Sequence, residues 1–197
     1  MTARWLPILL CTLVACGPTP APSVPPTTAP AVVPATAATI APASTPSADA
    51  PPRIVVLVRH GEKQSEARDA ALSPAGVTRA ACLADALAEL GVTHVFTTEF
   101  ARTRDTAAPL AARLGLTPEV VPAAEKDAWL ERLNALPPGA IALVAGHSNT
   151  VPELVAALGA GEVAIAGDTY DKLFAVVLPE HGAPTLLRLH YCPAPKA

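Results

Sequence analysis

The stretch Ile54-Val55-Val56-Leu57-Val58-Arg59-His60-Gly61-Glu62 decides how this chain folds. Its first five residues are apolar and mostly β-branched, and they lack the alternation of a strand that has one face in water. Such a run is typical of a strand that is buried on both faces of a parallel sheet. We therefore expect a β-strand over residues 54–58, followed at once by a loop of polar residues.

Strand and helix patterns alternate along the rest of the chain. Ser73-Pro74 opens a helix, because serine caps helix N-termini and proline fits the first turn, and the helical spacing of apolar residues continues to Leu90. Further helices are expected at about 101–114, 125–136 and 151–158, and further strands at 92–97, 119–121, 141–145, 173–178 and 185–189. The alternation predicts a three-layer α/β/α sandwich with a mostly parallel central sheet, occupying residues 53–197.

Chemically active side chains follow the ends of several predicted strands. Arg59 and His60 come directly after the first strand, Arg102 opens a helix, and His147 follows the strand at 141–145. Open sheets of this kind bind ligands at the carboxyl ends of their strands. Arginine forks match phosphate oxygens, and a neutral imidazole can act as a nucleophile. The pattern therefore indicates an anion site suited to phosphoryl transfer.

Four motifs occur in a defined order: Arg59-His60-Gly61-Glu62, Leu72-Ser73-Pro74-Ala75-Gly76, Arg102 with Thr106-Ala107, and Gly146-His147-Ser148-Asn149-Thr150. Together they resemble the histidine phosphatase superfamily, which has the phosphoglycerate-mutase-like fold. The resemblance implies that His60 is the nucleophile and becomes a phosphohistidine, while Arg59, Arg102 and His147 hold the phosphoryl oxygens. It implies a phosphatase that acts on a phosphorylated small molecule or a phosphoprotein, with no metal or organic cofactor.

Arg102 and Arg104 compete for one place in this site. They are two residues apart, so on a helix their side chains point about 200° apart and only one can face the ligand. In the family pattern, the arginine lies four residues before the threonine of a Thr-Ala pair. Counting back from Thr106 gives Arg102, and we expect Arg104 to lie on a solvated face.

The general acid is not determined by the sequence. Many members of the family carry a glutamate within a longer motif between the arginine helix and the second histidine, and that motif is not recognisable here. Glu125 is the first candidate and Asp127 the second, because both lie in the corresponding loop. Glu153 is assigned instead to a capping box with Thr150. The lack of a clear acid leaves a second function open: a weak or inactive protein that binds a phosphorylated ligand.

Other residues near the motifs keep two interpretations. Glu62 either orients the loop or His60, or is a surface carboxylate. Lys63 either meets a second anionic group of the substrate or is simply solvated. The segment Tyr170-Asp171-Lys172-Leu173-Phe174 leads into a strand and is interpreted as structural.

The N-terminal region predicts export to the cell envelope. Arg4 precedes a short apolar run, and Leu13-Val14-Ala15-Cys16 resembles the bacterial lipobox. That resemblance implies a signal peptide over 1–15, a lipid on Cys16 and attachment to a membrane. The segment 16–52 holds 11 prolines and too few large apolar side chains to offset the entropy of folding. We expect it to be a disordered tether, up to roughly 110 Å long if fully stretched.

Charge and cysteine content narrow the range of partners. The net charge of -3 provides no basic surface for nucleic acid. Cys82 and Cys192 are the cysteines beyond the predicted signal and lipidation site, and an exported domain permits a disulfide between them. Cys82 also suits the packed side of a helix, so both possibilities stay open. No pair of cysteines has the spacing of a structural zinc site.

Overall fold

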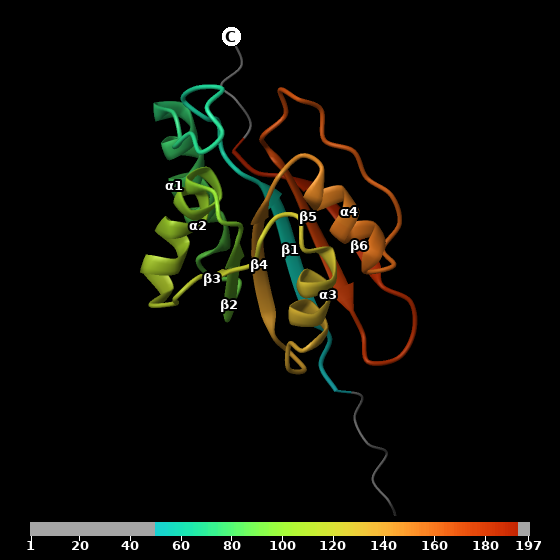
Figure 1. Cartoon of the computed structure of the whole chain (residues 1–197). Coiled ribbons are helices and arrows are strands. Elements are labelled where there is room, and N and C mark those ends of the chain that lie inside the picture. The colour runs from blue at the N-terminus through green and yellow to red at the C-terminus, as the bar shows by residue number, and fades with distance from the viewer. Residues whose placement is uncertain (1–49, 193–197) are drawn as a thin grey trace, which may run out of the picture. The chain divides into compact units, whose positions relative to one another are not determined.

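The structure is a computed structural model that describes residues 50–192. The strands are β1 (Arg53–Arg59), β2 (His94–Thr97), β3 (Glu119–Val120), β4 (Ile141–Gly146), β5 (Lys172–Leu178) and β6 (Thr185–His190). The helices are α1 (Pro74–Leu87), α2 (Ala101–Leu114), α3 (Lys126–Asn134) and α4 (Thr150–Ala157) (Figure 1). The predicted signal peptide, Cys16 and the predicted tether up to residue 49 lie outside the described residues.

The strands form one six-stranded sheet in the order β3-β2-β4-β1-β5-β6. The pairs β3–β2, β2–β4 and β4–β1 are parallel, whereas β5 is antiparallel to both β1 and β6. The expectation of a mostly parallel sheet is confirmed. Arg59 pairs with Gly146, and Thr97 pairs with Ala145, so the carboxyl ends of β1, β2 and β4 meet at one edge of the sheet.

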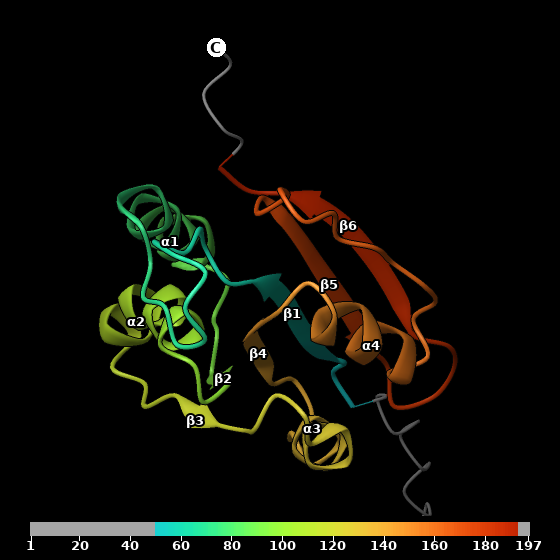
Figure 2. The same cartoon turned by 45° about the horizontal axis from the view of Figure 1, so that its top comes forward.

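Helices cover both faces of the sheet, as Figure 2 shows. Val55 and Leu57 of β1 lie in the core beneath α3 and α4, while Val56 and Val58 lie in the core beneath α1 and α2. All four side chains are essentially inaccessible to solvent. This burial explains the unbroken apolar run in β1 and confirms the three-layer α/β/α architecture.

Helix ends follow the sequence signals only in part. Ser73 caps α1, and its hydroxyl accepts a hydrogen bond from the Gly76 N–H at 3.2 Å. The helix ends at Leu87 instead of continuing to Leu90. The predicted capping box at the start of α4 is wrong, because the N-cap is Asn149 and makes no side-chain cap bond. The Thr150 hydroxyl instead accepts a hydrogen bond from the backbone N–H of His147 at 2.9 Å.

A disulfide joins α1 to the C-terminal end of the described chain. Cys82 and Cys192 are bonded, with their Cα atoms 6.2 Å apart and 110 residues between them in the sequence. This resolves the two possibilities left open for these cysteines. Within residues 50–192, no helix is both long and apolar enough to cross a membrane.

Candidate active site

A cavity of about 510 Å³ opens at the edge of the sheet where β1, β2 and β4 end. Arg59, His60, Arg102 and His147 all line it. Arg59 is the last residue of β1, His147 follows β4, and Arg102 lies in the first turn of α2. The parallel arrangement of the strands therefore brings together the four residues that the sequence had singled out.

The imidazole of His60 is held in one tautomer. Its Nδ1 lies 2.7 Å from the carbonyl oxygen of Gly61. A carbonyl oxygen can only accept, so Nδ1 carries the proton and Nε2 keeps its lone pair. The side chain is buried, with 5% of its surface exposed. Burial lowers the pKa of His60 to about 4, and the positive field of His147, Arg102 and Arg59 acts in the same direction.

Two glycines allow the start of α1 to lie directly against the loop that carries His60. A Cβ atom on Gly76 would lie 2.2 Å from the Glu62 carbonyl oxygen, and one on Gly61 would lie 3.0 Å from the Gly76 carbonyl oxygen. The Gly61 N–H donates to the hydroxyl of Thr106 at 2.9 Å. Gly61, Gly76 and Thr106 therefore fix the peptide that orients His60.

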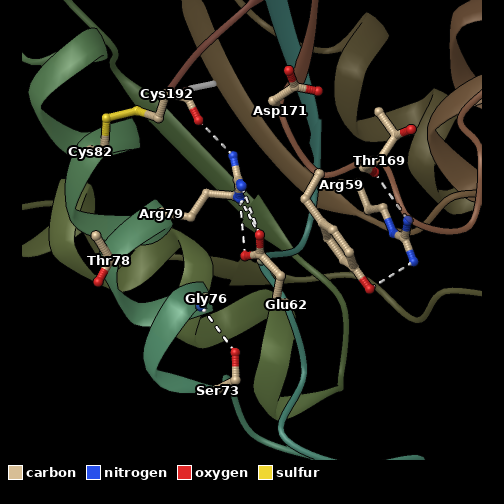
Figure 3. A network of polar contacts seen from close by, with 12 residues as sticks. Arg59, Glu62, Ser73, Gly76, Thr78, Arg79, Cys82, Thr169, Asp171 and Cys192 are labelled. Atoms are coloured by element: carbon tan, nitrogen blue, oxygen red, sulfur yellow. Dashed lines mark hydrogen bonds and ion pairs between the residues drawn. A yellow bond between two sulfur atoms is a disulfide. The ribbon is translucent and has the colours of Figure 1, made fainter. Parts of the chain in front are cut away.

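Arg59 is buried and held from one side by the loop at residues 166–170 (Figure 3). Its Nη1 donates to the carbonyl oxygens of Ala166, Gly167 and Thr169 at 3.1, 2.9 and 3.0 Å. Its guanidinium lies 4.0 Å from the centre of the Tyr170 ring. The Nε of Arg59 is buried and has no hydrogen-bond partner among the described residues. An unsatisfied buried N–H costs free energy, so Arg59 keeps one donor that the surrounding protein groups leave unused.

Arg102 and His147 form the opposite part of the site. The Nη1 of Arg102 donates to the Arg68 carbonyl oxygen at 2.7 Å, and its Nη2 lies 3.4 Å from Nδ1 of His147. Arginine only donates, so Nδ1 of His147 accepts and Nε2–H points to the Thr98 hydroxyl at 3.1 Å. Burial, followed by the charges of Arg102 and Arg59, lowers the pKa of His147 to about 4. The ring centroids of His60 and His147 are 5.3 Å apart.

The competition between the two arginines has a clear geometric outcome. Arg102 lines the cavity, whereas Arg104 does not and donates instead to the carbonyl oxygen of Glu99. The cavity also contains Lys63, which forms an ion pair with Glu66. Three residues at the site carried no sequence signal that could have marked them: Arg68 and Phe100 in the cavity wall, and Thr98, which contacts His147. Tyr170, interpreted from the sequence as structural, lies against the Arg59 guanidinium.

The proposed acids do not reach the cavity wall. Glu66 is the one carboxylate that lines the cavity within residues 50–192, and it is paired with Lys63. Glu125 is the N-cap residue of α3 and Asp127 lies in its first turn, outside the cavity lining. Glu153 lines a separate, smaller hollow. The role of Glu125 as an acid stays a prediction.

No group of three or more His, Cys, Asp or Glu side chains within the described part of the chain is arranged to hold a metal ion. The donors that face the cavity are mainly N–H groups of arginine and lysine and the imidazoles of two histidines. Such a set of donors suits an anion with several oxygen atoms.

Sequence comparison points to the same group of proteins as the motifs. A sequence profile described as the histidine phosphatase superfamily (branch 1) matches residues 55–129. The match contains Arg59, His60 and Arg102 and ends before His147. No curated protein matches the sequence significantly.

Solved structures of phosphatases share the fold. The protein histidine phosphatase SixA, in a complex with tungstate, is 25% identical, with a TM-score of 0.57 over 70% of this chain and 96% of that chain. A proposed phosphohistidine phosphatase from Nakamurella multipartitia is 24% identical, with a TM-score of 0.52 over 74% of this chain and all of that chain. A proposed α-ribazole-5′-phosphate phosphatase from Escherichia coli is 17% identical, with a TM-score of 0.58 over 70% and 96%. Residues 50–192 therefore adopt the phosphoglycerate-mutase-like α/β fold found in histidine phosphatases.

Proposed function

We propose that this protein is a phosphatase that hydrolyses a phosphate ester or a phosphoprotein through a phosphohistidine on His60. One observation carries the proposal: a buried imidazole with a free Nε2 lone pair lies in the same cavity as Arg59, Arg102 and His147. A nucleophile is useful in phosphoryl transfer only where the charge of the phosphoryl oxygens is balanced, and the two guanidinium groups supply that balance.

The first step forms a bond between Nε2 of His60 and phosphorus and breaks the bond from phosphorus to the leaving group. The Gly61 carbonyl, which accepts the Nδ1–H, stabilises the positive charge that develops on the imidazole. The guanidinium groups of Arg59 and Arg102, two residues that line the cavity, bind the phosphoryl oxygens. Water then attacks phosphorus, the phosphorus–nitrogen bond breaks, and neutral His60 is restored with phosphate as the product. The scheme needs no metal or organic cofactor.

The leaving group takes up a proton, and the cavity wall offers few donors for it. Glu66 is paired with Lys63, and His147 is neutral at physiological pH because its pKa is lowered to about 4. We infer that the substrate has a leaving group that departs without strong acid assistance. The similarity to SixA, a protein histidine phosphatase, favours a phosphoprotein among the candidate substrates.

The same shortage of proton donors favours one alternative function. A protein that binds a phosphorylated ligand and turns it over slowly or not at all would use the same arginines and histidines. Turnover separates the two functions, since both require the same cavity.

The decisive experiment measures hydrolysis of p-nitrophenyl phosphate and of a phosphohistidine protein by the purified chain from Gly17 onward, with a chelator present. His60→Ala should abolish turnover, while the matched control His181→Ala, at an exposed position, should retain it. Tungstate, the anion in the SixA complex, should inhibit the wild type. Wild-type rates in His60→Ala would refute the nucleophile. Tungstate binding without any turnover would favour the binding function.

We further propose that the protein is exported and held at a membrane of the cell envelope by a lipid on Cys16. The Cys82–Cys192 disulfide supports an oxidising compartment, because disulfides seldom persist in the cytosol. Labelled palmitate should be incorporated into the wild type and lost in Cys16→Ser, with the protein moving from the membrane fraction to the soluble fraction. An unlabelled wild-type protein would contradict the anchor.

A further inference from the structure

We propose that Arg79 is a positioning residue for His60, and that the Cys82–Cys192 disulfide orients Arg79 for this task. The proposal rests on the function proposed above. Arg79 lies in α1 and lines no part of the cavity around His60, so any effect on catalysis would pass through the residues that it contacts.

Arg79 forms a bidentate ion pair with Glu62 (Figure 3). Its Nε donates to the two carboxylate oxygens of Glu62 at 2.9 and 3.0 Å, and its Nη2 donates to Oε1 at 2.7 Å. The two side chains are only 10% and 25% exposed. Burial alone would raise the pKa of Glu62, but the hydrogen bonds and charge of Arg79 lower it below its ordinary value. The hydrogen bonds from Arg79 therefore hold the carboxylate in one orientation.

Glu62 is immobilised at its backbone as well. Its carbonyl oxygen accepts a hydrogen bond from the Ser73 N–H at 2.8 Å, and Gly76 packs against the same carbonyl. The Gly61 carbonyl, which holds the Nδ1–H of His60, belongs to the planar peptide that joins Gly61 to Glu62. Fixing Glu62 at its side chain and backbone therefore restricts rotation of the peptide that sets the tautomer and direction of His60.

The disulfide supplies the second anchor of Arg79. Cys82 lies three residues beyond Arg79 on α1, so the two side chains are neighbours on the helix surface. Its bond to Cys192 brings the Cys192 carbonyl oxygen to 2.9 Å from Nη1 of Arg79. Cys192 has a φ of 47°, a strained value that the surrounding contacts must maintain. Reduction would release this carbonyl and leave Glu62 as the remaining hydrogen-bond partner of the Arg79 guanidinium among the described residues.

The test compares Arg79→Gln and Arg79→Lys with Arg113→Gln in the full mature chain. Arg113 is a matched control, because it also forms an ion pair with a residue of α1, Asp85, but on an exposed surface. Misplacing a catalytic group by about 1 Å can cost about a hundredfold in rate. We expect kcat for p-nitrophenyl phosphate to fall by about tenfold to a hundredfold in Arg79→Gln, with tungstate inhibition unchanged, because Arg59, Arg102 and His147 keep their places.

Arg79→Lys should have a kcat between those of Arg79→Gln and the wild type, since lysine keeps the positive charge but cannot form the bidentate ion pair. Mild reduction should lower kcat in the wild type and have a smaller effect in Arg79→Gln, because both changes act through one contact. An unchanged kcat in Arg79→Gln, or equal effects of reduction in both proteins, would overturn the proposal. If Arg79→Gln does not fold, kcat and the effect of reduction are compared between Arg79→Lys and the wild type instead.

Nitrogen NMR of the His60 ring separates this proposal from the proposed function. Long-range proton–nitrogen spectra, assigned with His60→Ala, report which ring nitrogen carries the proton. We expect a single Nδ1–H form in the wild type and in Arg113→Gln, and a mixture of both tautomers in Arg79→Gln. Unchanged ring signals in Arg79→Gln would overturn the positioning role even in an active enzyme. A wild type that shows the expected signals without turnover would refute only the phosphatase.

Discussion

Acid should destabilise this protein through two histidines that are neutral when folded. His60 and His147 have pKa values lowered from 6.5 to about 4, mainly by burial. Between these values the unfolded chain binds a proton at each site and the folded chain does not. Stability therefore falls as pH decreases from about 6.5 to about 4.

The size of the effect follows from the same values. Each pH unit between the unfolded and folded pKa corresponds to about 1.4 kcal/mol. A fall from pH 7 to pH 4 should thus remove about 3 kcal/mol for each histidine and about 6 kcal/mol for both. This is a large part of the roughly 5–15 kcal/mol that stabilises a typical domain.

Urea unfolding followed by circular dichroism, repeated from pH 7 to pH 4, measures this loss. Replacing His60 with Ala should reduce the difference in unfolding free energy between the two pH values by about 3 kcal/mol. The exposed His181 serves as the control, and His181→Ala should retain the wild-type dependence. Equal pH dependence in His60→Ala and the wild type would refute the conclusion that His60 is buried in its neutral form.

Three other outcomes follow from the structure. In a pH–rate profile, the acid limb of kcat/KM should have its midpoint near pH 4, because His60 gains a proton there. A midpoint near pH 6.5 would contradict the burial of His60. Gly76→Ala should lower the free energy of unfolding by about 1–3 kcal/mol, because the new Cβ would lie 2.2 Å from the Glu62 carbonyl oxygen. An unchanged Tm in thermal unfolding would contradict this close approach. Reducing the disulfide between Cys82 and Cys192, 110 residues apart, should lower the free energy of unfolding by about 4–5 kcal/mol. An unchanged free energy in chemical unfolding would show that closing this loop contributes little to stability.

Local sequence patterns predicted most of the architecture because they report burial and chain geometry within a few residues. The apolar run of β1 showed that both of its faces are buried, and Ser73 marked the start of α1 correctly. The capping-box prediction failed because the side chain of Thr150 had a second possible partner. Thr150 fits a capping pattern, but its hydroxyl binds the backbone of His147.

The candidate site was predictable only as a set of residues. The order of strands and helices was enough to place Arg59, His60, Arg102 and His147 at one edge of the sheet. Helical geometry and the spacing to Thr106 separated Arg102 from Arg104. Whether Glu125 lines the cavity depends on how α3 packs, and the sequence carries no measure of that packing.

The sequence by itself determined the α/β class, the central strand and the four residues that converge at its end, because strand direction and helix periodicity are local properties of a chain. Tertiary structure alone decided the partners of those residues. Arg59 is held by carbonyl groups more than 100 residues away, and Glu62 is held by Arg79 together with a carbonyl that a disulfide brings from the far end of the domain. These contacts depend on the packing of separate layers, and no local pattern encodes the distance between two surfaces that meet only when the chain is folded.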